Sequence, residues 1–214
     1  KLGNTDQANG TYAPELTHVL HVLLAAGYDY DLASISGGQA PIYGTDIEGD
    51  VINDEILNNE EFQNRVNNTV PVAQINIDDY RAIFYPGGFG LLSDLASNAD
   101  FAKIAAEHYE NGGVIAAVCH GPAGLLPITL SSGMKLLADK SVTGFTREEE
   151  IDYAIKNGEE HGKDIFKIQL SDLCPVILLP NTIIVYERMI TSIQARLLQL
   201  RQSSENLKIA AGKP

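Results

Sequence analysis

The sequence predicts an α/β fold, a three-layer sandwich in which a mainly parallel, twisted sheet carries helices on both faces. Apolar runs of strand length alternate along the chain with segments of helical periodicity, and glycine pairs separate several of them. The run 114–118 is wholly apolar, as expected of a strand that is buried on both faces. Such alternation is typical of parallel sheets, which bind their ligands at the carboxyl ends of the strands.

Three segments are expected to form helices. Pro14 suits a first helical position, and residues 15–26 carry leucines and valines at helical spacing before a glycine. Residues 100–111 end in the same way, at the glycine pair 112–113. A closing helix is expected over residues 190–200, so helices both precede and follow the central strands.

The expected strands are short apolar runs bounded by turn residues: 28–35, 81–85, 114–118, 176–179 and 182–186. The first ends at the turn 36–38 (Ser-Gly-Gly), and the second ends at the turn 86–88 (Pro-Gly-Gly). Residues 39–80 between them are polar and rich in Asn and Asp, so they are expected to form short helices and loops.

Composition favours one soluble domain over residues 1–214. Hydrophobic residues make up 44% of the chain, and no repeat, low-complexity tract or flexible linker divides it. The formal net charge of −13 repels phosphate backbones and anionic lipid surfaces. No apolar run approaches the roughly 18 residues that span a bilayer. We therefore expect neither a nucleic-acid nor a membrane partner.

The chain has only two cysteines, Cys119 and Cys174, which lie far apart in the sequence. Such low cysteine use fits a reducing compartment, so a cytoplasmic location is expected. Cys174 precedes a proline in an apolar stretch and is expected to be a core residue.

His18 and His21 lie three residues apart on the first expected helix, a spacing that suits a metal ion. No third ligand is evident in the sequence. Both are therefore interpreted as ordinary helix residues, and no metal site is expected.

Cys119 directly follows the apolar run 114–118 and precedes His120, Gly121 and Pro122. A strand, a polar pair and a Gly-Pro helix start form the sequence pattern of a nucleophile elbow. The turn lifts the side chain above the sheet, and the helix N-terminus and the imidazole are expected to lower the thiol pKa from about 8.5. A buried, inert cysteine is the alternative. The Cys-His-Gly-Pro context favours the nucleophile.

The segment 112–123 (GGVIAAVCHGPA) resembles the nucleophile segment of the ThiJ/PfpI superfamily, in particular its heat-shock chaperone and glutathione-independent glyoxalase branch. Further segments that agree in order and spacing are 10–15, 85–90 with Asp94, and 142–146 with the three glutamates that follow. Together they cover residues 1–155. The resemblance implies a flavodoxin-like fold of the class I glutamine amidotransferase type, whose opening strand is expected before Lys1.

The resemblance implies a catalytic group around Cys119. It implies that His120 is the base, and that Glu15 is a carboxyl group that shares a hydrogen bond with the thiol. Glu150 matches the acidic third member best, and Glu149 is a close second. A carboxyl group that moves protons near neutral pH needs a raised pKa, which burial supplies. Without the resemblance, the histidine would be a turn residue and the glutamates ordinary charges at helix starts.

Four residues are expected to surround the substrate. Gly87 and Gly88 are expected to present backbone N–H groups to an oxyanion, because glycine permits close backbone approach. Gly121 lets the backbone bend after the nucleophile. Phe89 stands where the branch usually carries His, so a more apolar pocket is expected. The segment 187–195 also departs from the closing stretch of the branch.

The function implied by the resemblance is that of a glutathione-independent glyoxalase, which converts 2-oxoaldehydes such as methylglyoxal into 2-hydroxyacids such as lactate without a cofactor. Cys119 would add to the aldehyde, and Glu15 with His120 would move a proton through an enediol. One alternative is a cysteine peptidase or amidase that uses Cys119, His120 and Glu150. Another is a stress chaperone or cysteine redox sensor without enzymatic activity. The superfamily commonly forms homodimers, so a homodimer is expected.

Overall fold

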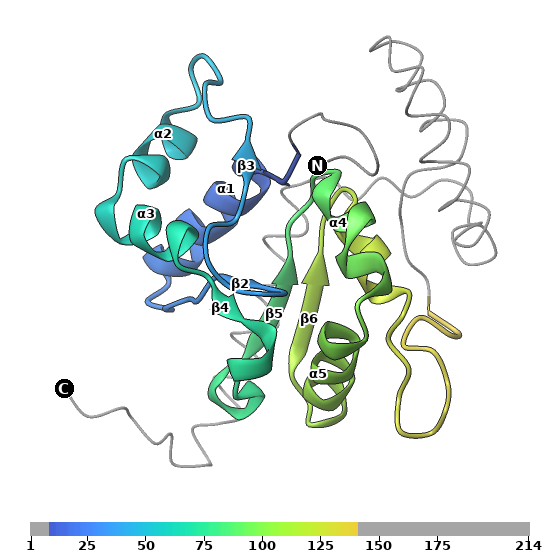
Figure 1. Cartoon of the computed structure of the whole chain (residues 1–214). Coiled ribbons are helices and arrows are strands. Elements are labelled where there is room, and N and C mark those ends of the chain that lie inside the picture. Colours follow the sequence, from blue (N-terminus) through green and yellow to red (C-terminus); the bar gives the residue numbers. More distant parts are fainter. Residues whose placement is uncertain (1–8, 141–214) are drawn as a thin grey trace, which may run out of the picture. The chain divides into compact units, whose positions relative to one another are not determined.

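The structure is a computed structural model that describes residues 9–140 of the 214-residue chain (Figure 1). The described residues all belong to one compact unit, Lys1–Asn181, and the second unit, Thr182–Pro214, contains none of them. No helix in the described part is long and apolar enough to cross a membrane. The elements expected beyond residue 140, together with Cys174, lie outside the described residues.

Parallel strand pairs and helices alternate in the described part, which is therefore a mixed α/β structure. The strands are β1 (Thr11–Tyr12), β2 (Ala33–Ser34), β3 (Ile42–Tyr43), β4 (Val70–Pro71), β5 (Ala82–Tyr85) and β6 (Val114–Ala117). The α-helices are α1 (Ala13–Ala25), α2 (Val51–Leu57), α3 (Glu60–Asn67), α4 (Gly90–Ser93) and α5 (Ala99–Glu110). Four 3₁₀ helices complete the order: η1 (Val72–Gln74), η2 (Ile77–Asp79), η3 (Leu95–Ser97) and η4 (Gly121–Leu125).

Strands β5 and β6 form a parallel pair that positions the candidate site (Figure 1). At their carboxyl ends Tyr85 lies opposite Ala117, and the Val118 N–H donates to the Tyr85 carbonyl at 3.1 Å. Both strands were predicted, at 81–85 and 114–118, and both are confirmed. Because the two strands end at the same level, the segments that follow β5 and β6 meet at the carboxyl edge of the pair.

Helix α5 packs against one face of this strand pair through an alanine surface. Ala102, Ala105 and Ala106 are buried in a cluster to which Ile83 of β5 and Ile115 of β6 also pack. Short side chains let a helix approach a sheet closely. The Asn98 side chain caps the helix by accepting from two backbone N–H groups of the first turn. The prediction of a helix over 100–111 is confirmed.

Helix α1 is also confirmed, with a proline in its first turn. Its end is set by Gly27, whose φ of +80° suits glycine better than other residues. Leu16 and Leu20 are buried with Phe62 and Val66 of α3, so α1 covers the hydrophobic core of this part of the chain.

The prediction for residues 28–80 was less accurate. The expected strand 28–35 shortens to β2, because its parallel pairing with β4 covers only Ala33 and Ser34. Before β2, Asp29 pairs with Arg65, and Asp31 accepts from the Tyr80 hydroxyl. Short helices were expected between residues 39 and 80 and are present as α2 and α3. The two-residue strands β3 and β4 were not expected there.

Polar contacts join α1 to α2. The Thr17 hydroxyl donates to Asn53 at 2.8 Å, and both side chains are fully buried. His18 Nε2 lies 2.8 Å from the carboxylate of Asp50, which caps α2, and His21 lies 4.0 Å from Glu55. These contacts give both histidines structural partners. Among the described residues, no group of three or more His, Cys, Asp or Glu side chains could hold a metal ion.

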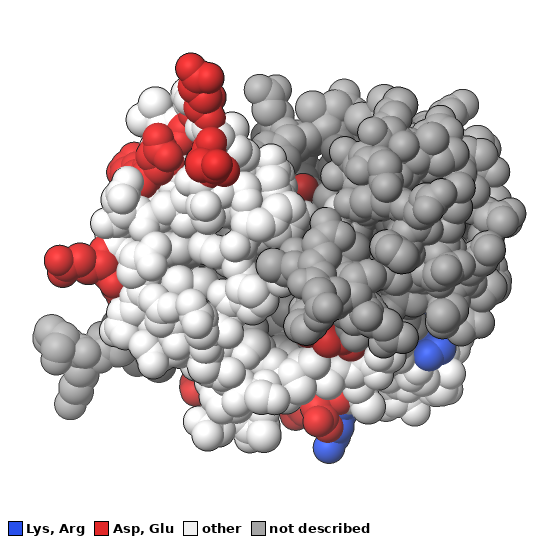
Figure 2. Space-filling model, turned by 45° about the horizontal axis from the view of Figure 1, so that its top comes forward, with Lys and Arg blue, Asp and Glu red and all other residues white. Residues whose placement is uncertain are grey.

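The face in Figure 2 carries more acidic than basic side chains, in keeping with the net charge of −13. The acidic side chains lie in several separate groups on this face (Figure 2).

His108 is a buried histidine near the end of α5. Its side chain is 4% exposed, its Nε2 has no hydrogen-bond partner in the described part of the chain, and its ring fills the space beside Gly113. Burial lowers its pKa, against the opposing effect of hydrogen bonds with the backbone of Val114 and Arg81. The folded protein therefore favours the neutral imidazole.

Replacing His108 with glutamine is expected to flatten the pH dependence of the unfolding free energy below about pH 6.5. Because the folded-state pKa lies below the unfolded one, the unfolded chain binds more protons as the pH falls. The parent then loses up to about 1.4 kcal/mol of stability per pH unit in this window. Urea unfolding at a series of pH values measures the slope. Parallel slopes are expected above the window, and equal slopes within it would contradict the assignment.

Candidate active site

Three elements bring Glu15, Gly87 and Cys119 together. Glu15 lies in the first turn of α1, Gly87 follows β5 and Cys119 follows β6. A Cβ atom on Gly87 would overlap both the Glu15 carboxyl group and the Cys119 side chain. The Tyr12 N–H donates to the Gly87 carbonyl at 3.1 Å and ties the start of α1 to this loop. The absence of a side chain at Gly87 therefore allows the carboxyl and the thiol to approach each other.

The backbone at Cys119 has the left-handed conformation of a nucleophile elbow, with φ of +55°. Among the described residues, Asp139 is the other non-glycine residue with positive φ, which is a strained region for most side chains. Gly121 packs against the Tyr85 carbonyl, where a Cβ atom would overlap it. The tight turn after β6 thus requires a small residue two positions after the cysteine.

The segment after the elbow differs from the expected α-helix. It is the five-residue 3₁₀ helix η4, whose sequence contains two glycines and a proline. These residues are weak helix formers, which explains why a full α-helical turn is not reached. The expected field of an α-helix N-terminus at the sulfur is correspondingly reduced.

His120 and Cys119 contact each other although they are adjacent in sequence. The Cys119 Sγ and His120 Nδ1 atoms are 3.3 Å apart. The imidazole also packs against the ring of Phe89, with ring centroids 4.6 Å apart and planes inclined by 42°. The histidine is therefore within reach of the sulfur proton and is held by an aromatic neighbour.

Burial raises the pKa of Glu15, and interactions with Cys119, His120 and the Gly87 backbone oppose the increase without cancelling it. Its Oε2 atom is buried and has no hydrogen-bond partner in the described part of the chain. A proton on this carboxyl group would relieve the cost of a buried charge. This agrees with the raised pKa expected from the sequence.

The pKa of Cys119 differs from the sequence-based expectation. Burial first, and then the charge and hydrogen bond of Glu15, raise the pKa of Cys119 to about 12, whereas a lowered value was predicted. The backbone N–H groups of Gly88 and His120 act in the opposite direction. The local sequence indicated the groups that favour a thiolate but not the depth of burial or the nearby carboxylate.

Two acidic groups in contact share their protons and titrate as a pair. At neutral pH the Glu15–Cys119 pair is expected to hold one proton. That proton lies on the sulfur in one arrangement and on the carboxyl group in the other. In the second arrangement the sulfur is a thiolate beside Gly88, His120 and a neutral carboxyl group.

Gly88 has a φ of +109°, and a Cβ atom there would overlap the backbone of Gly10 and Tyr12. These two constraints explain glycine at this position. The Gly88 N–H faces the Cys119 sulfur, and the Gly87 N–H faces the Glu15 carboxyl group. Both predicted glycines therefore present backbone donors to the candidate reacting groups.

Tyr12 borders this site, because its backbone N–H donates to the Gly87 carbonyl, although the sequence analysis did not select it. Burial and the charges of Glu15, Asp50 and Cys119 raise the pKa of its phenol group. Its ring packs against Tyr43 with the centroids 5.3 Å apart. The signal in the sequence was its position in the segment 10–15, immediately before the helix that carries the glutamate.

The structure thus brings together most of the predicted site residues: Glu15, Gly87, Gly88, Phe89, Cys119, His120 and Gly121. Glu149 and Glu150 lie outside the described residues. The acidic third member of the predicted catalytic group therefore stays a prediction.

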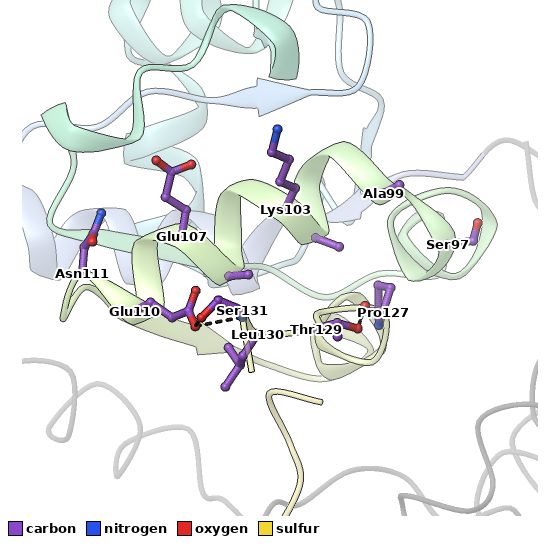
Figure 3. Close-up of a pocket in the computed structure, with 12 residues that line it drawn as sticks. Ser97, Ala99, Lys103, Glu107, Glu110, Asn111, Pro127, Thr129, Leu130 and Ser131 are labelled. Atoms are coloured by element: carbon purple, nitrogen blue, oxygen red, sulfur yellow. Dashed lines mark hydrogen bonds between the residues drawn. The ribbon is translucent and has the colours of Figure 1, made fainter. Parts of the chain in front are cut away.

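A groove of about 510 Å³ lies along α5 (Figure 3). Residues 97–111 and 127–131 line it, and none of the predicted site residues does. Glu110 accepts from the Ser131 backbone at 2.9 Å, and Lys103 and Glu107 also line the groove (Figure 3). The groove is separate from the cysteine site.

A sequence model of the DJ-1/PfpI family matches residues 7–198. The chain belongs to the DJ-1/PfpI family. This confirms the resemblance inferred from the nucleophile segment and its companions. The parallel strands and the mixed α/β structure of the described part agree with membership of the DJ-1/PfpI family.

Curated relatives in the DJ-1/PfpI family carry glyoxalase names. Glutathione-independent glyoxalase HSP31 of Saccharomyces cerevisiae is 35% identical over 147 residues, which are 64% of this chain and 60% of that protein. Glyoxalase 3 of Candida albicans is 33% identical over 146 residues, again 64% and 60%. Glutathione-independent glyoxalase hsp3102 of Schizosaccharomyces pombe is 29% identical over 173 residues, covering 73% and 70%. The chain spans about 60% of the length of the first two relatives.

Solved structures show the same similarity. Rapid Encystment Protein 24 KDa of Francisella tularensis superposes with a TM-score of 0.66 and 32% identity, covering 73% of this chain and 70% of that chain. Glyoxalase III of Candida albicans gives a TM-score of 0.62 and 28% identity, covering 79% and 75%. The predicted similarity to the heat-shock and glutathione-independent glyoxalase branch of the DJ-1/PfpI family is confirmed.

Proposed function

We propose that this protein is a cysteine-dependent glyoxalase that converts 2-oxoaldehydes such as methylglyoxal into 2-hydroxyacids without glutathione. The observation that carries the proposal is the contact of Glu15 with Cys119 at the elbow, where a thiol, a carboxyl group of raised pKa and an imidazole converge. Relatives with glyoxalase names support the choice of reaction.

The first step forms a bond between the Cys119 sulfur and the aldehyde carbon. The reactive arrangement has a thiolate at Cys119 and a proton on Glu15. As the sulfur adds, the carbonyl electrons move to oxygen, and the oxygen takes the proton from Glu15 to give a hemithioacetal and a Glu15 carboxylate. Backbone N–H groups of Gly87 and Gly88 favour the developing negative charge.

The second step moves a proton between neighbouring carbons. Glu15, with His120 beside it, takes the proton from the former aldehyde carbon and passes it to the adjacent carbonyl oxygen, which gives an enediol. The hydroxyl on the sulfur-bearing carbon then gives up its proton, a proton returns to the other carbon, and a thioester of the hydroxyacid is left on Cys119. Water then cleaves the carbon–sulfur bond, releases the 2-hydroxyacid and returns a proton to the pair. One water is consumed overall, with no net oxidation and no external cofactor.

The broader features of the protein are proposed from the same similarity. Residues 1–214 form one domain, a three-layer sandwich of the flavodoxin type, in keeping with the family match over 7–198. Glu150 supplies the acidic partner of His120. The protein is a cytoplasmic homodimer, and Phe89 makes its substrate pocket more apolar.

The test is lactate formation from methylglyoxal in the absence of glutathione, with a metal chelator present. We expect turnover that neither added glutathione nor the chelator changes. A fluorogenic short peptide is offered in parallel. Release of the fluorophore without lactate would contradict the glyoxalase proposal and favour a cysteine peptidase. Absence of both products would exclude both enzymatic functions.

A further inference from the structure

Phe89 places its ring against the imidazole of His120, with a geometry favourable for aromatic pairs. The two residues come from different loops, since Phe89 follows the glycine turn after β5 and His120 follows β6. The pair therefore joins the two loops that form the candidate site.

Hydrophobic contacts anchor Phe89. It packs against the buried pair Leu92 and Ala123, against which Leu126 also packs. Leu92 belongs to α4, and Ala123 belongs to η4. Helices α4 and η4, which follow the two loops, therefore hold the phenyl ring. Its position does not depend on a bound substrate.

The imidazole of His120 can contact the Cys119 sulfur only at certain side-chain torsion angles, so a neighbour that fixes those angles preserves the contact. Nδ1 lies 3.3 Å from the Cys119 sulfur. Rotation of the histidine into another staggered rotamer would move Nδ1 by several ångströms and end the contact. A ring packed against the imidazole restricts that rotation.

We propose that Phe89 is a positioning residue that holds the His120 imidazole with Nδ1 at the Cys119 sulfur. The inference rests on the proposed role of Cys119 as the nucleophile, and it assigns Phe89 a part beyond making the pocket apolar. The held imidazole favours the arrangement in which the sulfur is a thiolate and the proton lies on Glu15. Loss of the ring lowers the population of that arrangement.

The other ionisable groups near the sulfur are the same in the parent, Phe89→Ala and Leu126→Ala, and Phe89→Tyr adds one phenol, which is neutral at about pH 7. Glu15 faces the sulfur from α1, and Tyr12 approaches from β1 with a pKa raised by burial and by nearby charges. Because neither is changed, an altered sulfur reactivity on truncation of Phe89 reports on the imidazole.

The experiment compares Phe89→Ala, Phe89→Tyr and Leu126→Ala in the full chain. Tyrosine keeps the aromatic ring, and Leu126→Ala removes apolar bulk from the same hydrophobic cluster while leaving the ring in place. Iodoacetamide labelling of Cys119 is followed by peptide mass spectrometry, which separates it from Cys174. The labelling rate of each variant at about pH 7 is divided by that of the parent at the same pH. Leu126→Ala shows how far a change in access alone alters this ratio.

The ratio is expected to fall about tenfold in Phe89→Ala and to stay within about twofold in the other two variants. Turnover of methylglyoxal is expected to lose at least about tenfold in kcat, with KM changed by less than about threefold. A ratio in Phe89→Ala that matches Leu126→Ala would overturn the positioning role. A parent that forms no lactate would refute the glyoxalase proposal alone, since the labelling ratio does not depend on that reaction.

Discussion

Replacing Cys119 with alanine is expected to lower lactate formation from methylglyoxal by at least about 10³-fold. The substitution removes the atom that forms the covalent bond to the aldehyde, and no other described side chain at the site is a comparable nucleophile. Serine at this position keeps the shape but ionises far less readily, so it is expected to recover little of the activity. Lactate is measured enzymatically at saturating methylglyoxal.

The fold should survive this change. Alanine and cysteine both carry a Cβ atom, so each bears a similar strain at the φ of +55°. Cys174→Ala is the matched control, and it should keep turnover within about threefold. Lactate formation by Cys119→Ala at more than about a tenth of the parent rate, with an unchanged melting temperature, would remove Cys119 from the mechanism.

Long segments with clear ends were predictable from the sequence because their signals are local. The helix at 100–111 has its cap, Asn98, and its glycine stop directly at its two ends, and the strand at 114–118 is apolar throughout. The two-residue strands β3 and β4 carry no comparable pattern. Each exists because a distant strand lies beside it, β1 for the first and β2 for the second.

The candidate site was likewise predictable only in part, where its signals are local in the sequence. Cys119, His120 and the glycines were visible as motifs at the ends of predicted strands. The contact between Phe89 and His120 was not, because it depends on two loops that are brought together by the β5–β6 pairing. The raised pKa of Cys119 was missed for a related reason. Its causes are burial and the charge of Glu15, a residue of another element.

Replacing Glu15 with glutamine is expected to lower turnover by about 10²- to 10⁴-fold, since the amide keeps the size of the side chain but cannot move a proton. It should also simplify the reaction of Cys119 with iodoacetamide. In the parent, two coupled acids make the labelling rate rise in two steps with increasing pH. In the variant one acid remains, and the rate rises in one step. Because the charge of Glu15 raises the Cys119 pKa, that step should lie below the second step of the parent.

Glu60→Gln is the matched control, because Glu60 also lies in the first turn of a helix but is exposed and far along the chain from the cysteine. Loss of favourable charge at a helix N-terminus costs Glu60→Gln about 0.3–1 kcal/mol. In Glu15→Gln the same cost is offset, because the burial that raises the Glu15 pKa makes its charge unfavourable in the folded protein. Only Glu15→Gln should lose turnover and the second labelling step. If the two variants behaved alike in both measurements, Glu15 would be a helix-start charge, and the proton transfer between carbons would need another base.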